Sequence, residues 1–278
     1  MNKLIPPCTY QGGKQRLSEQ IVNIIFEQNN INNDTKFYDL CCGSGAISIE
    51  LINKGIHPNN IIMIDAGIWG KLWNSIANNK FEIDVLKNEI NKLPSIEKIK
   101  SYLKEINSSK VNSELDIYHF LLQQAGAFGG KAVDINGNRW VNSTFRNYWT
   151  PTETSNRKSP VNPMMPMPDT LYERMVSINE IMGGCITAFY CEIDKINWNF
   201  DKNSIVYIDP PYKNTSGYNH DFNYELFIKK YSHLTNIYLS EGYKISDNSI
   251  LLSKGRSKGN INGKINKKPT EEWLNIFK

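Results

Sequence analysis

The feature that most constrains the fold lies between residues 36 and 65, where the sequence reads as a strand, a glycine turn, a helix and a second strand. The run KFYDLC has the apolar character of a buried strand, and Gly43 and Gly45 follow it directly. Ser44 can cap a helix that Gly55 ends, and the run NIIMID is a second buried strand. Such a unit predicts two parallel strands in an open α/β sheet.

A second motif stops a strand abruptly. The apolar run 205–208 leads into Asp209, Pro210, Pro211 and Tyr212. Two consecutive prolines donate no N–H, so they cannot continue a sheet ladder. They form a stiff corner beyond the carboxyl end of the strand, which is the edge where ligands bind in open α/β sheets. We therefore expect Asp209 and Tyr212 at the rim of an active site.

The remaining apolar patterns complete a doubly wound sheet of roughly seven strands. Further strands are expected at 185–191, 236–240, 249–253 and 271–277, and helices at 14–28, 68–79, 81–92, 95–106, 113–127, 169–182 and 222–234.

More than a hundred residues separate Asp65 from the strand at Cys185, which is far more than a crossover needs. We expect a catalytic domain made of residues 1–66 and 185–278, and a mainly helical inserted region at 67–184. Inside the insertion, AVDINGNRWV alternates around Asn136-Gly137, a pattern that predicts a hairpin with a type I′ turn.

Charge and cysteine content exclude several classes of protein. The formal net charge is +4, which is weak evidence for a polyanionic partner. A basic run, read either as a solvated loop or as a phosphate contact, holds Lys254, Arg256, Lys258, Lys264, Lys267 and Lys268. Five cysteines without a CxxC pair favour reduced thiols in a cytoplasm over disulfides or a zinc site. We expect neither a signal peptide nor a membrane span.

The glycine turn and Asp65 together indicate a nucleoside cofactor. Glycines between a strand and a helix let the backbone approach a ligand, and an acid at the tip of the second strand can accept both ribose hydroxyls. The third glycine of a dinucleotide fingerprint is replaced by Ser48. The pattern does not choose between NAD and S-adenosylmethionine, and a plain tight turn stays open. Upstream, Tyr10 and Lys14 in YQGGKQRL suit a small anion, with a surface helix cap as the alternative.

The Asp-Pro-Pro-Tyr corner suits the activation of an aromatic amine. Such an amine is a poor nucleophile because its lone pair is conjugated with the ring. Two hydrogen-bond acceptors, one for each amine hydrogen, would draw the nitrogen towards tetrahedral geometry and free the lone pair. The Asp209 carboxylate and the Pro210 carbonyl can be these acceptors, with the methyl donor in line. Tyr212 can stack on the base. A structural turn remains the alternative.

The blocks PPCTYQGGKQRL, YDLCCGSGAISIEL with IIMID, and IVYIDPPY resemble the Dam-like (D12) class of DNA adenine-N6 methyltransferases of bacteria and phages. The resemblance implies a class I methyltransferase fold, S-adenosylmethionine as the donor, and an adenine extruded from double-stranded DNA as the acceptor. It also implies that the long insertion reads the target. Protection from restriction, including phage anti-restriction, self-marking and regulation all stay open as biological uses, and neither a metal nor an obligate protein partner is implied.

The resemblance assigns roles by position. The catalytic block is Asp209, Pro210, Pro211 and Tyr212. The residues expected to bind the cofactor are Tyr10, Lys14, Asp39, Gly43, Gly45, Asp65, Asp209 and Glu192, with Asp194 as the alternative to Glu192. The candidates for DNA contact, each with a plain surface role still open, are Asn138, Arg139, Arg146, Arg157, Lys158, Lys254, Arg256 and Lys258. The rival functions are an N4-cytosine methyltransferase, a non-catalytic DNA-binding protein and an NAD enzyme.

Overall fold

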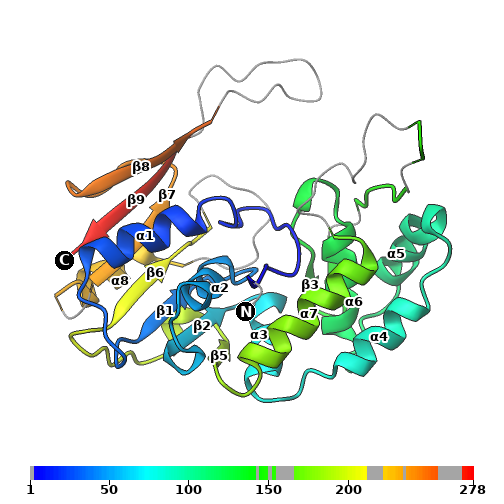
Figure 1. Cartoon of the computed structure of the whole chain (residues 1–278), viewed down its shortest axis with the longest axis horizontal. Coiled ribbons are helices and arrows are strands. Elements are labelled where there is room, and N and C mark those ends of the chain that lie inside the picture. The colour runs from blue at the N-terminus through cyan, green and yellow to red at the C-terminus, as the bar shows by residue number, and fades with distance from the viewer. Residues whose placement is uncertain are drawn as a thin grey trace.

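A seven-stranded sheet lies beside a group of helices in the computed structural model of the chain (Figure 1). The structure describes residues 3–141, 144–149, 152–154, 166–211, 222–233, 236–255 and 271–278. The strands are β1 (Phe37–Leu40), β2 (Ile61–Asp65), β5 (Thr187–Tyr190), β6 (Ile205–Ile208), β7 (Asn236–Glu241), β8 (Ser249–Lys254) and β9 (Glu271–Phe277).

The sheet order confirms the predicted doubly wound architecture. The order is β5-β2-β1-β6-β7-β9-β8, with β1 paired in parallel to both β2 and β6. The outer pairs β2–β5 and β6–β7 are also parallel, and β9 runs antiparallel between β7 and β8. The carboxyl ends of β1, β2 and β6 therefore meet at one edge, where the chain order reverses direction across the sheet.

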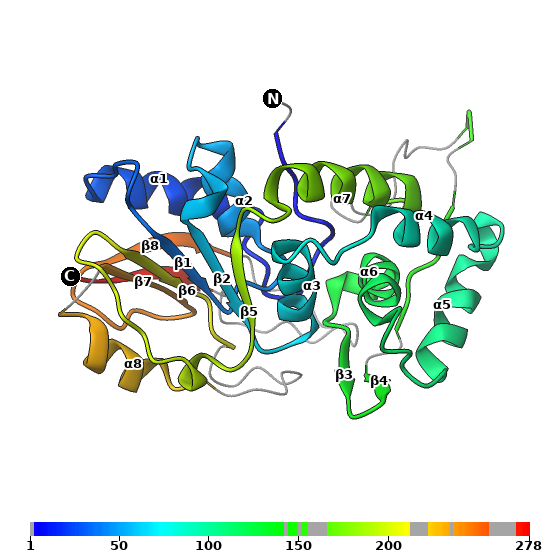
Figure 2. The ribbon, with the colours of Figure 1, turned by 90° about the horizontal axis from the view of Figure 1, so that it is seen from below.

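Side chains alternate between two apolar cores along the central strands. In β6, Ile205 and Tyr207 join one core, whereas Val206 and Ile208 join the other. The first core contains residues of α1 (Ser18–Gln28) and α2 (Ala46–Asn53), and the second contains residues of α8 (Tyr224–Tyr231). Figure 2 shows α1 and α2 on one face of the sheet and α8 on the other. Because both faces are covered, the central strands are mainly apolar, and Asp39 of β1 and Asp65 of β2 lie near the carboxyl ends of their strands.

Four predicted helices of the insertion are confirmed, together with the long helix that follows them. They are α3 (Ile68–Ala77), α4 (Ile83–Asn91), α5 (Ile99–Ser108), α6 (Asp116–Gly126) and α7 (Pro168–Met182). The helix α3 packs on β2 and β5 as well as on α6 and α7, so it joins the sheet to the rest of the insertion. One apolar core runs from Phe37 of β1 through Trp73 of α3 to Phe120 of α6. The proposed boundary at residue 67 therefore falls before a helix that both parts share.

The predicted hairpin forms, with a different turn. Its strands are β3 (Asp134–Asn136) and β4 (Arg139–Val141), and Asn136 pairs with Arg139. The loop residues are consequently Gly137 and Asn138, of which only Gly137 has a positive φ, of 62°. A glycine in the first loop position fits a type II′ turn, so the predicted type I′ turn around Asn136-Gly137 is wrong by one residue.

The predicted cap of α2 is also wrong. The residue before the first turn is Gly45, with φ 70°, and no side chain caps the helix. The left-handed conformation of Gly45 carries the chain from the loop into the helix, so Ser44 lies one position too early to serve as the cap.

Among the described helices, none combines the length and apolar character needed to span a membrane.

Candidate active site

The glycine loop needs glycine at two positions for steric reasons. Gly43 and Gly45 have φ values of 48° and 70°. A Cβ on Gly45 would lie 2.6 Å from Cζ2 of Trp73, and a Cβ on Gly43 would lie 3.0 Å from the ring of Tyr10. The indole Nε1 of Trp73 donates a hydrogen bond of 2.7 Å to the carbonyl of Gly43. The loop therefore packs between the side chains of Tyr10 and Trp73, which leave little room for a Cβ at either glycine.

Two buried or half-buried acids fix the loop from the ends of β1 and β2. Asp65 accepts hydrogen bonds from the amides of Gly43 (2.9 Å) and Gly67 (2.8 Å), which orients its carboxylate beside the loop. Asp39 is buried and accepts from the amide and hydroxyl of Ser48, at 3.2 and 2.7 Å. Burial raises the pKa of Asp39 to about 7, although the hydrogen bonds from Ser48 oppose the rise. Asp39 therefore anchors the start of α2.

These side chains surround one pocket at the carboxyl edge of the sheet. Of the residues predicted to bind the cofactor, the structure brings seven into its lining: Tyr10, Lys14, Asp39, Gly43, Asp65, Glu192 and Asp209. Gly45 is not part of the lining, but it lies against Trp73, whose indole bonds to the lining residue Gly43. Asp194 lines the pocket beside Glu192, so geometry leaves the choice between these two acids open.

The pocket is acidic. Its described lining holds six carboxylate side chains and one lysine; the carboxylates are those of Asp39, Asp65, Asp134, Glu192, Asp194 and Asp209. Tyr10 and Trp69 add an aromatic wall, with their rings edge to face at a centroid distance of 5.6 Å. A lining of this kind favours a cationic ligand with an apolar body and disfavours a diphosphate. Within the described ranges, no three side chains of the kinds that bind metals gather at one point.

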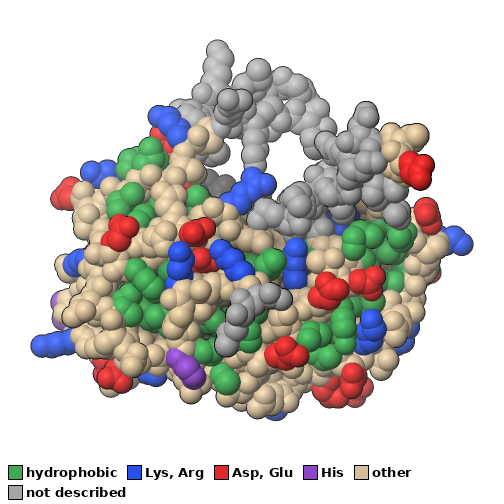
Figure 3. Space-filling view, viewed as in Figure 1, with side chains coloured by type: hydrophobic (Ala, Val, Ile, Leu, Met, Phe, Trp, Pro, Cys, Tyr) green, Lys and Arg blue, Asp and Glu red, His purple; other side chains and the backbone are tan. Residues whose placement is uncertain are grey.

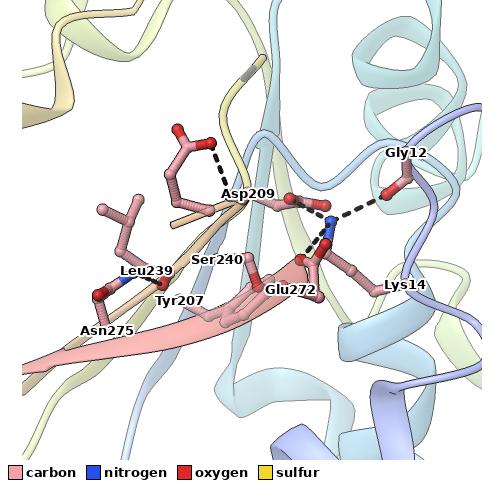
Figure 4. Close-up of polar contacts among 10 residues, drawn as sticks. Gly12, Lys14, Tyr207, Asp209, Leu239, Ser240, Glu272 and Asn275 are labelled. Carbon is pink, nitrogen blue, oxygen red and sulfur yellow. Dashed lines mark hydrogen bonds and ion pairs between the residues drawn. The ribbon is translucent and has the colours of Figure 1, made fainter. Parts of the chain in front are cut away.

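Lys14 lies at the proline corner, the segment from Asp209 to Pro211 that ends β6. Its ammonium nitrogen is 2.5 Å from Oδ1 of Asp209, 3.0 Å from the carbonyl oxygen of Gly12 and 3.5 Å from Oε1 of Glu272 (Figure 4). The lysine side chain is only 6% exposed. The sequence suggested that Lys14 meets a small anion of the cofactor, whereas in the structure it contacts the acid of the proline corner.

The charges around the corner oppose one another. Burial, with smaller contributions from the carboxylates of Glu272 and Glu241, raises the net pKa of Asp209 to about 6. The ammonium of Lys14 acts in the opposite direction and favours the ionised acid. At neutral pH the balance leaves Asp209 largely ionised and close to its titration range.

The strand β9 carries Glu272 to this corner, and Asn275 helps to fix the strand. The side-chain Nδ2 of Asn275 donates to the backbone carbonyl of Leu239 at 3.5 Å, and its Oδ1 accepts from the hydroxyl of Ser249 at 2.7 Å. These bonds link β9 to β7 and β8. Figure 4 shows Asn275 and Glu272 along the same strand, with Glu272 at the end nearest Lys14. The sequence predicted a strand at 271–277, which β9 confirms, but did not single out Glu272.

Sequence reasoning also missed one wall of the pocket. Ala132, Val133 and Asp134 lie at the root of the hairpin and line the pocket. A Cβ on Gly67 would lie 3.8 Å from Oδ1 of Asp134 and 3.2 Å from Oδ1 of Asp65, which places both carboxylates beside this glycine. The alternating pattern identified the hairpin, but no local signal shows which part of it faces a ligand.

The candidates for DNA contact lie in different environments. Asn138 and Arg139 are exposed at the tip of the hairpin, and Lys254 is exposed and 3.3 Å from Glu271. Arg146 is buried: it donates a hydrogen bond of 2.7 Å to the carbonyl of Pro166 and lies 4.1 Å above the ring of Tyr148. This stacking buries Arg146 within the insertion instead of exposing it, and its contact with DNA stays a prediction.

The other candidates cannot be placed. Tyr212, Arg157, Lys158, Arg256 and Lys258 lie outside the described residues. On the described surface in Figure 3, acidic and basic side chains are interspersed, in keeping with the small net charge.

Comparison with known proteins finds a family match for the amino-terminal half of the chain. The model of the family described as D12 class N6 adenine-specific DNA methyltransferase matches residues 10–159. The match begins at Tyr10 and covers Lys14, the glycine loop, Asp65 and the hairpin, and it ends before the proline corner. A search of curated proteins found no match. The place of Asp209 in the site therefore depends on the geometry described above.

Proposed function

Since the chain belongs to the D12 class of N6 adenine-specific DNA methyltransferases, we propose that its acidic pocket binds S-adenosylmethionine and that the proline corner activates the target amine. The activity of the class is the transfer of a methyl group to N6 of adenine in DNA, and the sheet is that of a class I methyltransferase. The family match does not favour the N4-cytosine or non-catalytic alternatives.

One observation supports the proposal most strongly: Asp65 and Asp209, at the ends of β2 and β6, line the same pocket with the glycine loop between them. The sulfonium and ammonium groups of S-adenosylmethionine are cationic, and they suit a pocket with more carboxylates than ammonium groups. The two phosphates of NAD would meet the same carboxylates unfavourably. The residues of the pocket thus fit S-adenosylmethionine better than NAD.

Particular residues are proposed to hold the cofactor. Asp65, oriented by two backbone amides, accepts the ribose hydroxyls. Glu192 or Asp194 faces the adenine ring, and Tyr10 covers the methionine chain beside the glycine loop. When bound, S-adenosylmethionine supplies an activated methyl group on a positively charged sulfur.

The corner is proposed to act on the extruded base. The ionised carboxylate of Asp209 accepts one hydrogen of the adenine N6 amine, and the carbonyl of Pro210 accepts the other. Lys14 keeps Asp209 ionised despite its burial. The positions of the two acceptors are fixed because the backbone amide of Asp209 donates to the carbonyl of Leu40 at 3.1 Å, which ties the corner to β1. Tyr212 is proposed to stack on the base.

The proposal is tested with labelled S-adenosylmethionine and unmethylated genomic duplex DNA, followed by digestion and nucleoside analysis. The wild-type protein should produce N6-methyladenine and bind the cofactor in calorimetry. We expect Asp209→Ala to keep the Kd for S-adenosylmethionine within about tenfold while methyl transfer falls by about a thousandfold or more. Asp201→Ala, which changes an exposed acid outside the pocket, is the control. Normal turnover by the Asp209 variant would show that the corner is not catalytic.

We further propose that Lys254, Arg256 and Lys258 contact DNA phosphates. Lys254 is exposed near the end of β8. Replacement of all three by alanine should weaken DNA binding and reduce the slope of log K against log salt by up to about 2.7. An unchanged slope would leave these side chains as a solvated surface.

A further inference from the structure

One buried side chain joins two backbone segments that are distant in sequence. Gln124, near the end of α6, is fully buried. Its Nε2 lies 3.2 Å from the carbonyl oxygen of Thr9, 3.1 Å from that of Lys131 and 3.4 Å from that of Gly130. Its Oε1 accepts a hydrogen bond of 2.9 Å from the amide of Val133. A carboxamide has two N–H donors, so it bonds to two of these three carbonyls at a time.

Both segments that Gln124 joins are walls of the pocket. Thr9 immediately precedes Tyr10 and Gln11, which line one side. Val133 lies in a second wall, between the lining residues Ala132 and Asp134. The walls also meet directly, because the amide of Gln11 donates a hydrogen bond of 2.6 Å to the carbonyl of Gly130. Gln124 therefore bonds to both walls at once, beside the direct bond from Gln11 to Gly130.

The second wall continues into the hairpin. The strand β3 begins at Asp134, the residue after Val133, and Asp134 itself lines the pocket. The hairpin has three residues in each strand, and Asn138 and Arg139 lie at its tip. The tip is tied to the helical region because the amide of Val111 donates to the carbonyl of Asn138 at 3.0 Å. Figure 2 shows the hairpin projecting beside α6. A short, bonded hairpin transmits a shift of its root to its tip.

We propose that Gln124 is a positioning residue that holds the amino-terminal wall of the pocket against the root of the hairpin, so that cofactor and DNA strengthen each other's binding. The inference rests on the proposed function, since it takes the pocket as the cofactor site and the hairpin tip as a DNA contact. A ligand in the pocket orders both walls and thereby the hairpin. DNA that engages the hairpin orders the wall that the cofactor contacts, and thermodynamic linkage requires the two effects to be equal.

The test compares two glutamines of equal burial. Gln123 is also fully buried on α6, but its Oε1 accepts a hydrogen bond from Asn107 (2.7 Å), away from the pocket lining. Gln124→Met and Gln123→Met each replace a buried amide with an apolar chain of similar length. Binding of S-adenosylhomocysteine, which cannot turn over, is measured by calorimetry with and without unmethylated genomic duplex DNA. Thermal unfolding of each variant is measured in parallel.

We expect Gln124→Met to raise the Kd for S-adenosylhomocysteine about tenfold and to remove the strengthening by DNA that the wild type shows. Gln123→Met should keep both properties within about twofold, even if both variants lower Tm by a similar amount. Equal effects of the two variants on Kd, or persistence of the DNA effect in Gln124→Met, would overturn the inference. If the wild type itself fails to bind the nucleoside, the proposed function fails instead.

A measurement on the unmodified protein covers the case in which Gln124→Met does not fold. Hydrogen exchange is followed with and without S-adenosylhomocysteine. Protection should rise in the segment 10–14 and extend through 130–139 to the tip of the hairpin. Protection confined to the glycine loop and the amino-terminal segment would contradict a link through Gln124.

Discussion

Replacement of Lys14 by methionine should move the acid limb of the pH–rate profile to higher pH. The pKa of Asp209 is about 6 because burial and the carboxylates of Glu272 and Glu241 outweigh the ammonium of Lys14. Methionine removes the cation at 2.5 Å and leaves everything that raises the pKa. A neighbouring cation lowers the pKa of an acid by about 1–3 units, so the variant should titrate at about 7–9.

The sign and size of the effect follow from this shift. The proposed mechanism needs the ionised acid, so we expect activity to be lost as the pH falls through the pKa of Asp209. With a shift of about 2 units, the ionised fraction of Asp209 at pH 7.5 falls from about 0.97 to about 0.24, which predicts about a fourfold loss at that pH and little loss above about pH 9.

The assay is kcat/KM for S-adenosylmethionine from pH 5 to 10, with genomic duplex DNA as acceptor, because this ratio reports the pKa of the free enzyme. Lys14→Arg retains the charge and should keep the limb near pH 6. Lys71→Met is the matched control, because it removes an ion pair of the same length, with Asp116, away from the pocket lining. A limb at the wild-type position in Lys14→Met would refute the idea that this lysine holds Asp209 ionised.

Three further results are expected. Gly45→Ala should lower the free energy of unfolding by about 2–5 kcal/mol, since the added Cβ would lie 2.6 Å from Trp73 and φ at this position is positive. Gly55→Ala, where the added Cβ has open space, should lower it by less in the same denaturant titration. Asp39 has a pKa of about 7, above its ordinary value, so its ionisation lowers stability as the pH rises from that ordinary value to about 7, and the loss is complete above that pH. Asp39→Asn should therefore raise Tm at pH 8 by about 2–6 °C, and the difference should shrink as the pH falls towards 5; an equal difference at both pH values would contradict the cause given for the shift. Arg139→Ala should weaken discrimination between sites by about 1–3 kcal/mol, seen as a broader set of methylated sequences in site mapping, and an unaltered set would exclude Arg139 from base readout.

Local signals made the central sheet and half of the site predictable. Glycines between a strand and a helix, paired prolines and an acid at the end of a strand can each be recognised from a few neighbouring residues. Gly43, Asp65 and Asp209 could therefore be found without a structure. The parallel order of β1, β2 and β6 then follows from the rules for α/β sheets, which bring these residues to one edge.

The parts that were missed depend on contacts between distant segments. Glu272 reaches the corner only because β9 inserts between β7 and β8, and nothing near it in sequence shows this. Arg146 carries a charge that favours exposure, yet the ring of Tyr148 and the carbonyl of Pro166 bury it. Gln124 lies in an apolar helix, where its sequence neighbours do not reveal the two walls that it joins.

The central strand β1 has a consequence for the kinetics of folding. Phe37 pairs with Ile61 on one side and with Ile205 on the other, so the edge that bears the pocket closes only when segments about 168 residues apart have met. Contacts of such long range form slowly, and the pocket gathers its lining from stretches between Tyr10 and Phe222. We expect a nucleoside that contacts all of these stretches to bind only once they have come together, after the rate-limiting barrier to folding. The cofactor should therefore slow the unfolding of the enzyme without speeding its refolding.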